Sequence, residues 1–221
     1  MPSLADRYHR LKSTLPQHVQ LIAVSKTRTV QEIRALYDLG HRAFGENYPQ
    51  ELKEKQPQLP SDIEWHFIGH LQTNKVKLIA PFVHLVHSAD SERLLDELNK
   101  RATGLGRSIG ALLQVHVAQE ETKHGFAPEE LRTLVPEWRG RWPGLHVQGL
   151  MAMASLTGER SRIEAEFSLA AGLFKELKTM GVFTAESFTE LSMGMSGDLD
   201  LAIAHGSTMV RVGTALFGDR Q

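Results

Sequence analysis

The sequence predicts a single-domain (β/α)8 TIM barrel over residues 1–221, and three observations lead to this fold class. Short apolar stretches alternate with charged amphipathic stretches eight times along the chain, as expected for buried parallel strands separated by helices. No low-complexity linker or change of composition divides the 221 residues. Because typical barrels have roughly 250 residues, this one is expected to be compact.

The eight expected strands are short and rich in Val, Ile, Leu or Phe, and the second is the weakest. They cover residues 21–24, 43–44, 65–68, 83–86, 111–117, 146–150, 188–191 and 209–212.

The segments around the strands carry helix signals. Residues 30–37 place their apolar side chains on one face. The stretch 91–98 follows Asp90, a common N-cap type, and Pro128 stands in the first turn of its helix. The expected helices are 4–15, which precedes the first strand, then 30–37, 91–98, 127–131 and 163–180, the longest.

An open doubly wound sheet is the competing architecture. It would need about five or six strands and usually carries a glycine-rich loop after the first one. Here the first strand ends in Ser25-Lys26-Thr27 without glycine. The sequence therefore favours the barrel.

Composition excludes several classes of protein. The chain has no cysteine, so disulfides, zinc–cysteine sites, iron–sulfur clusters and thiol nucleophiles are excluded. With 25 basic and 26 acidic residues, a generally basic nucleic-acid surface is not expected. No apolar run approaches the roughly 18 residues of a membrane span, and the charged N-terminus is unlike a secretory signal. We expect a cytoplasmic protein.

The residues that leave the strands are the candidates for chemistry, because barrel sites lie at the carboxyl ends of the strands. Lys26 leaves the first strand and is placed at the barrel mouth. Desolvation there would lower the pKa of its amine and free it for Schiff-base chemistry. On position alone, a surface lysine at a strand end is the simpler interpretation.

Two small-residue loops strengthen the case for Lys26. Residues 192–196 and Gly213-Thr214 follow the seventh and eighth strands, where barrels commonly bind phosphate. Together with the lysine they indicate a phosphorylated aldehyde, and pyridoxal 5′-phosphate (PLP) is the obvious candidate. Arg211 lies between these loops and the barrel centre, where it would keep a pyridine nitrogen unprotonated. An ion pair of Arg211 with Asp198 or Asp200 is the structural alternative.

These residues lie in segments that resemble a known family, the YggS/PROSC family of PLP homeostasis proteins. The resemblance spans nearly the whole chain and rests on residues 23–27, 44–48, 65–75, 149–151, 191–196 and 206–218.

The resemblance implies a barrel of the alanine-racemase N-terminal-domain type and assigns a role to each cofactor-binding residue. It implies that Lys26 forms a Schiff base with PLP and that Arg211 faces the pyridine nitrogen. The remaining assignments are Ser196, Gly213 and Thr214 at the phosphate with Ser192 nearby, Asn47 beside the cofactor, and Met151 lining the ring. His70, where many members have proline, receives no role, and the loop 121–125 is expected to close over the site.

The family implies PLP, vitamin B6 and amino-acid homeostasis with little or no catalysis. Alanine racemases add a C-terminal domain with a catalytic tyrosine, and racemisation needs a base on each face of the substrate carbon. We expect neither in a chain that ends at Gln221. A PLP-dependent racemase and a Schiff-base aldolase stay as alternatives. We expect a monomer that binds PLP, with PLP-receiving apo-enzymes as further partners and neither nucleic acid nor membrane.

The histidines do not indicate a metal site. His66 and His70 stand four apart, which separates them by roughly 13 Å along a strand, and no carboxylate cluster supports them. His84 and His87 fall on opposite faces of the fourth expected strand, which predicts one buried polar group and one mouth residue.

Overall fold

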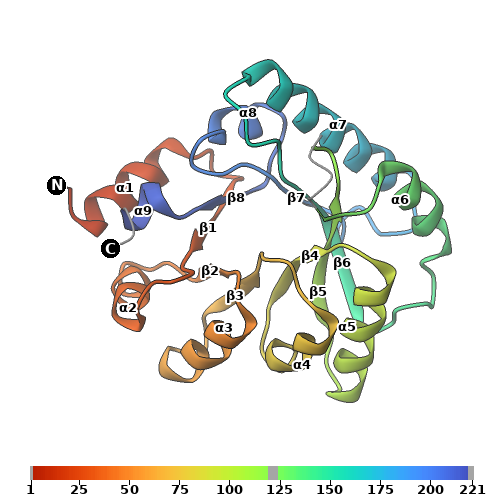
Figure 1. Ribbon diagram of the computed structural model, residues 1–221, viewed down its shortest axis with the longest axis horizontal. Coiled ribbons are helices and arrows are strands. Elements are labelled where there is room, and N and C mark those ends of the chain that lie inside the picture. The colour runs from red at the N-terminus through yellow and green to blue at the C-terminus, as the bar shows by residue number, and fades with distance from the viewer. Residues whose placement is uncertain (1, 119–123, 219–221) are drawn as a thin grey trace.

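Eight parallel strands close into a barrel in which β1 pairs with β8, as the sequence predicts (Figure 1). The structure, a computed structural model, describes residues 2–118 and 124–218. The strands are β1 (Gln20–Val24), β2 (Ala43–Glu46), β3 (Glu64–Phe67), β4 (Leu85–Ala89), β5 (Ile109–Val115), β6 (Leu145–Ala152), β7 (Glu190–Ser192) and β8 (Met209–Val212).

Helices surround the strands as an outer ring (Figure 1). Among the described residues they are α1 (Leu4–Thr14), α2 (Val30–Asp38), α3 (Pro49–Lys55), α4 (Val76–Ile79), α5 (Glu92–Gly104), α6 (Pro128–Leu134), α7 (Arg160–Thr179), α8 (Leu199–Ala204) and α9 (Thr214–Phe217), with short 3-10 turns η1 (Gln56–Gln58), η2 (Thr73–Lys75) and η3 (Val135–Glu137). The first and last helices lie side by side, and Arg7 Nε on α1 donates to the Leu216 carbonyl oxygen at 2.7 Å.

Side-chain caps fix the starts of several helices. Ser3 and Asp6 form a capping box at α1, and Thr29 and Glu32 form another at α2. At α5 the expected cap was wrong: Ser91, not Asp90, accepts from the backbone N–H of the first turn. The Asp90 carboxylate is already bonded to His70 and to the Ser91 hydroxyl.

Several strand bounds differ from the expected ones because pairing with a neighbour, not apolar character, sets them. β4 begins at Leu85, where it pairs with His66 of β3, two residues later than the sequence indicated. β7 begins at Glu190, where it pairs with Gly149 of β6. Phe188, expected to open that strand, is fully buried and stacks between aromatic rings instead.

Alternation along the strands divides the core into two clusters. In β1, Leu21 and Ala23 belong to the large cluster between strands and helices, whereas Ile22 belongs to a small separate one. The small cluster takes residues from six strands, which places it inside the barrel. Its buried members are Ile22, Ala43, Leu85, Leu112, Met151 and Met209. The interior below the mouth is therefore packed with side chains.

No helix within residues 2–118 and 124–218 combines the length and apolar character that a membrane span requires.

Candidate functional site

A cavity of about 270 Å³ opens where β1 and β8 end. Its wall contains five of the residues predicted from the sequence, which the fold brings together from three separate segments. The lining residues are Val24, Lys26, Arg28, Met195, Ser196, Gly197, Arg211, Gly213 and Thr214. The cavity thus places a lysine, two arginines and small hydroxyl or glycine residues around one space.

The backbone that presents Lys26 is strained. Thr27 has φ 63°, the one positive φ of a non-glycine residue in the part of the chain that the structure describes. A β-branched side chain seldom takes this conformation, and such a residue persists only where its surroundings hold it. The Thr27 N–H donates to Glu51 Oε1 at 2.6 Å, so a side chain from α3 fixes the turn that follows Lys26.

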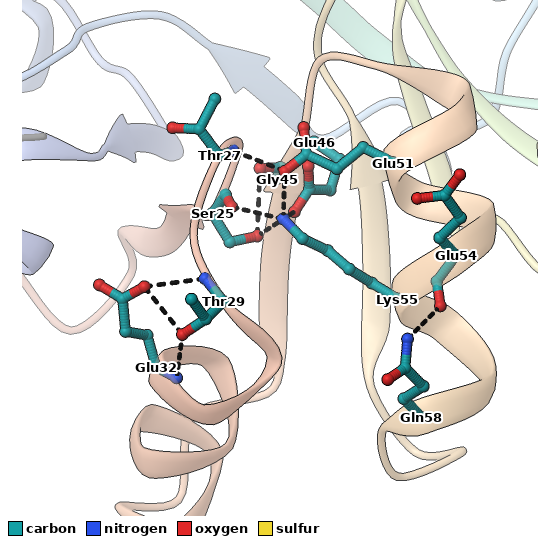
Figure 2. Close-up of polar contacts among 10 residues, drawn as sticks. All are labelled: Ser25, Thr27, Thr29, Glu32, Gly45, Glu46, Glu51, Glu54, Lys55 and Gln58. Atoms are coloured by element: carbon teal, nitrogen blue, oxygen red, sulfur yellow. Dashed lines mark hydrogen bonds and ion pairs between the residues drawn. The ribbon is translucent and has the colours of Figure 1, made fainter. Parts of the chain in front are cut away.

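A buried polar cluster behind this turn was missed by the sequence analysis (Figure 2). Lys55 points from α3 toward the end of β1, and its Nζ donates to the Ser25 carbonyl oxygen, to Glu46 Oε1 and to Glu51 Oε1 at 2.8, 2.8 and 2.6 Å. The Ser25 hydroxyl donates to the same Glu46 oxygen at 2.7 Å. Lys55 therefore holds Ser25, the residue before Lys26. It also holds the Glu51 carboxylate, which fixes Thr27, the residue after Lys26.

Glu46 sits where a charge is costly. Its side chain is fully buried at the end of β2, and burial raises the pKa of its carboxyl although Lys55 opposes the shift. Glu51 and Lys55 have the i,i+4 spacing of a helical ion pair, which is the one sequence signal for the cluster. That spacing does not reveal that the lysine is buried.

Arg211 connects the cavity to the neighbouring strands. It is 4% exposed; its Nη1 donates to the Ser192 carbonyl oxygen at 2.9 Å and to Ser192 Oγ at 2.6 Å, and Nη2 donates to the Ala152 carbonyl oxygen at 3.0 Å. Burial lowers the pKa of the guanidinium to about 10, so it is still cationic at pH 7. Asp200, one alternative partner considered from the sequence, pairs with Arg160 instead.

Ser192 belongs to a chain of hydrogen bonds inside the barrel. His87 Nδ1 lies 2.9 Å from Ser192 Oγ, and His87 Nε2 lies 2.9 Å from His66 Nδ1. Burial lowers the pKa of His66 to about 3 and that of His87 well below its usual value, so both rings are neutral at pH 7. Of the two histidines considered for strand four, His87 is the buried polar group, as one of the pair was expected to be, whereas His84 is exposed and precedes β4 at its amino end, away from the mouth.

Three predicted residues lie outside the cavity wall. Ser192 and Met151 are fully buried within β7 and β6, not beyond their ends, and Met151 packs in the barrel interior. Asn47 follows β2, and its Oδ1 is buried without a hydrogen-bond partner among the described residues. Of the loop 121–125 expected to close over the site, residues 121–123 lie outside the described part of the chain.

Comparisons with known proteins identify the family and the fold. The family model described as "Alanine racemase, N-terminal domain" matches residues 1–221. "Pyridoxal phosphate homeostasis protein" of Pasteurella multocida is 39% identical over 207 residues, covering 91% of this chain and 87% of the relative. The protein of the same name from Pseudomonas aeruginosa is 41% identical over 206 residues, covering 93% and 86%.

Solved structures show the same architecture. PipY of Synechococcus elongatus PCC7942 without PLP has a TM-score of 0.92 at 40% identity, covering 98% of this chain and all of PipY. The structure of PipY with PLP bound has a TM-score of 0.88 at 39% identity, with the same coverage. Alanine racemase of Clostridium difficile 630 has a TM-score of 0.76 at 14% identity, covering 98% of this chain and 56% of the racemase, a likeness of fold alone.

Proposed function

Because the chain belongs to the family of pyridoxal phosphate homeostasis proteins, whose barrel is that of the alanine racemase N-terminal domain, we propose that it binds PLP. We further propose that it serves intracellular PLP and amino-acid homeostasis with little or no catalysis. The observation that carries the proposal is the convergence of Lys26, Arg211 and the Ser196, Gly213 and Thr214 group on one cavity.

The residues present fit PLP. Its aldehyde reacts with amines and its ring withdraws electrons from a bound carbon. We assign Lys26 to hold the aldehyde. Ser196, Gly213 and Thr214 offer hydroxyls and closely approachable backbone N–H groups, the donors that a phosphate needs. Asn47 Oδ1, buried without a described partner, offers an acceptor beside the end of β2.

Arg211 limits the chemistry that the site supports. Its guanidinium is fixed by three carbonyl or hydroxyl contacts and keeps its charge at neutral pH. We assign it to face the pyridine nitrogen of PLP, where a cation opposes protonation of that nitrogen. An unprotonated ring draws electrons weakly, which favours holding PLP over transforming an amino acid.

The cavity wall also speaks against the racemase alternative. Racemisation needs a proton donor or acceptor on each face of the substrate carbon. Among the described residues of the wall, Lys26 supplies one such group, and none is a tyrosine, histidine, aspartate or glutamate. We extend the proposal to a single-domain, cytoplasmic monomer from which apo-enzymes receive PLP. Ser192 and Met151 then act from behind the cavity wall, Ser192 by holding Arg211.

Borohydride trapping tests the proposal. The purified protein incubated with PLP is expected to gain the absorbance band of a Schiff base. Borohydride reduction should remove this band and leave PLP covalently attached to Lys26, as peptide mass would show. Lys26→Ala should lose the band, whereas Lys53→Ala, an exposed lysine of α3, should keep it. A label on another lysine, or a band that persists in Lys26→Ala, rejects the assignment. Alanine racemisation on the order of 1–10³ s⁻¹ would reject the carrier function.

A further inference from the structure

The amino end of the barrel, opposite the cavity, gathers three potential metal ligands. Glu64 opens β3, His66 stands two residues later, and His84 directly precedes β4. One ligand atom from each side chain lies within 4.8 Å of the other two. None of these residues takes part in the PLP site proposed above, so this inference stands or falls independently of that function.

The strand register explains why the three meet. Glu64 and His66 are two apart on one strand and therefore project from the same face. His66 pairs with Leu85 of β4, which brings the preceding residue, His84, beside the start of β3. The pair considered from the sequence, His66 with His70, is not the pair that the fold joins, because His70 clusters with Asp90 and His124 instead.

His66 supplies the observation that points to a ligand. The residue is 1% exposed, and its Nε2 is buried with no hydrogen-bond partner among the described residues. Leaving a buried nitrogen of this kind without a partner is destabilising. His66 Nδ1 is already bonded to His87, so Nε2 is the nitrogen left to bind a ligand. Glu64 is partly buried and His84 is exposed, so both can move toward it.

We propose that Glu64, His66 Nε2 and His84 bind a divalent transition-metal ion of the Zn²⁺ type. Two imidazoles and a carboxylate form a ligand set that suits this ion, which binds each donor at about 2.0–2.2 Å. The buried His66 is the fixed ligand, and the exposed His84 and Glu64 close around the ion. Water completes the coordination at the solvent-facing side.

The hydrogen bonds behind His66 accommodate this role. A metal on Nε2 requires the tautomer in which Nδ1 carries the proton and donates to His87 Nε2. His87 Nδ1 then donates to Ser192 Oγ, whose two lone pairs also accept from Arg211. Every hydrogen bond in this series from His66 to Arg211 is kept. The metal binds His66 Nε2, the nitrogen in the series that lacks a partner among the described residues.

Ring geometry separates this cluster from the second one. The His66 and His84 rings are 5.5 Å apart and inclined by 49°, so their in-plane lone pairs can be turned toward a common point. His70 and His124 are stacked at 3.7 Å and 14°, so their lone pairs run side by side. His70 Nδ1 is also already bonded to Asp90. The second cluster therefore serves as the control.

Calorimetric titration with ZnCl₂ of the untagged, chelator-treated protein tests the site. We expect one ion per chain, bound about 100-fold or more weakly in His84→Ala and in Glu64→Gln, since even the loss of a second-shell group costs roughly 10–100-fold. Both side chains reach solvent, so these variants should keep the melting temperature of the parent in chelator. His70→Ala should bind Zn²⁺ as the parent does.

Cobalt gives a second measurement that reports ligand geometry. Co²⁺ should produce the visible bands of a low-coordinate nitrogen and oxygen site in the parent and in His70→Ala, and not in His84→Ala. The proposal is overturned by the absence of Zn²⁺ binding tighter than about 1 mM. It is equally overturned by binding that persists unchanged in His84→Ala and Glu64→Gln, or that His70→Ala removes.

Discussion

Lys55 Nζ lies 2.8 Å from Glu46 Oε1, and both side chains are buried beneath the turn that presents Lys26. Breaking a buried pair leaves one charge without a partner. We therefore expect Lys55→Met to lower the free energy of unfolding by about 3–5 kcal/mol, measured by urea denaturation. Lys53→Met, on the exposed side of the same helix, should change it by no more than about 0.5 kcal/mol.

The same substitution separates stability from positioning. In the double variant Glu46→Gln/Lys55→Met no buried charge is left alone, so part of the lost stability should return. In the double variant the Ser25 carbonyl and Glu51 still lack Lys55 Nζ, the donor that they share in the parent. Reductive trapping of PLP on Lys26 should therefore be slower than in the parent. Trapping at the parental rate would show that Lys55 does not position the turn.

The positive φ of Thr27 predicts a stability gain when the residue is replaced by glycine. Left-handed backbone costs a non-glycine residue about 1–2 kcal/mol, and a glycine would remove this cost. Glycine itself costs roughly 0.5–1 kcal/mol through backbone entropy, which offsets part of the gain. Thr27→Gly should therefore raise the free energy of unfolding by up to about 1.5 kcal/mol, and Thr27→Ala, which keeps Cβ, by less. Equal effects of the two substitutions in urea denaturation would mean that φ is not the source of strain.

Arg211 predicts a charge effect on the bound cofactor. Arg211→Glu replaces a cation with a carboxylate, so the pKa of the pyridine nitrogen should rise, which a pH titration of the absorbance of bound PLP measures. Arg211→Lys keeps the positive charge and should leave that pKa near the parental value. If PLP stays bound to Arg211→Glu and its titration does not move, the guanidinium does not face the nitrogen.

Local patterns in the sequence were sufficient for the barrel and for part of the site. Lys26, Ser196, Arg211, Gly213 and Thr214 could be predicted because each lies at or just beyond a strand end, and barrel topology brings such positions to one mouth. The eight apolar stretches identified the strands for a different reason, because each strand is buried on both faces.

The supporting groups depend on register and helix orientation, which local patterns do not encode. Lys55 is ordinarily an exposed residue type, and only the placement of α3 against β1 buries it. The link from His66 through His87 to Ser192 joins three strands, so no spacing along the chain predicts it. Ser192 was identified as a residue near the phosphate, whereas its hydroxyl contacts Arg211 and His87.

Gly149 and Gly172 form a matched pair for testing the packing of β6. Gly149 has φ 153°, and a Cβ there would lie 1.7 Å from the Glu190 carbonyl oxygen of β7. Gly149→Ala should therefore cost more than about 3 kcal/mol of the free energy of unfolding or prevent folding. Gly172 lies within α7, and a Cβ there meets no atom within 4 Å, so Gly172→Ala should add about 0.5–1 kcal/mol. A well-folded Gly149→Ala protein of parental stability would contradict this account of the β6–β7 contact.

His41 gives the pH dependence of stability a direction. Burial lowers the pKa of its imidazole from 6.5 to about 4. Between these values the unfolded chain binds the proton and the folded chain does not, so stability is full above pH 6.5 and falls as the pH is lowered toward 4. The loss attributable to His41 is up to about 3 kcal/mol. His41→Gln should flatten this part of the stability curve in urea denaturation at pH 4 to 7, whereas His18→Gln, at an exposed position, should keep the parental slope. If His41→Gln keeps the parental slope, other buried groups cause the acid sensitivity. His66 and His87 are such groups, because burial also lowers the pKa of each.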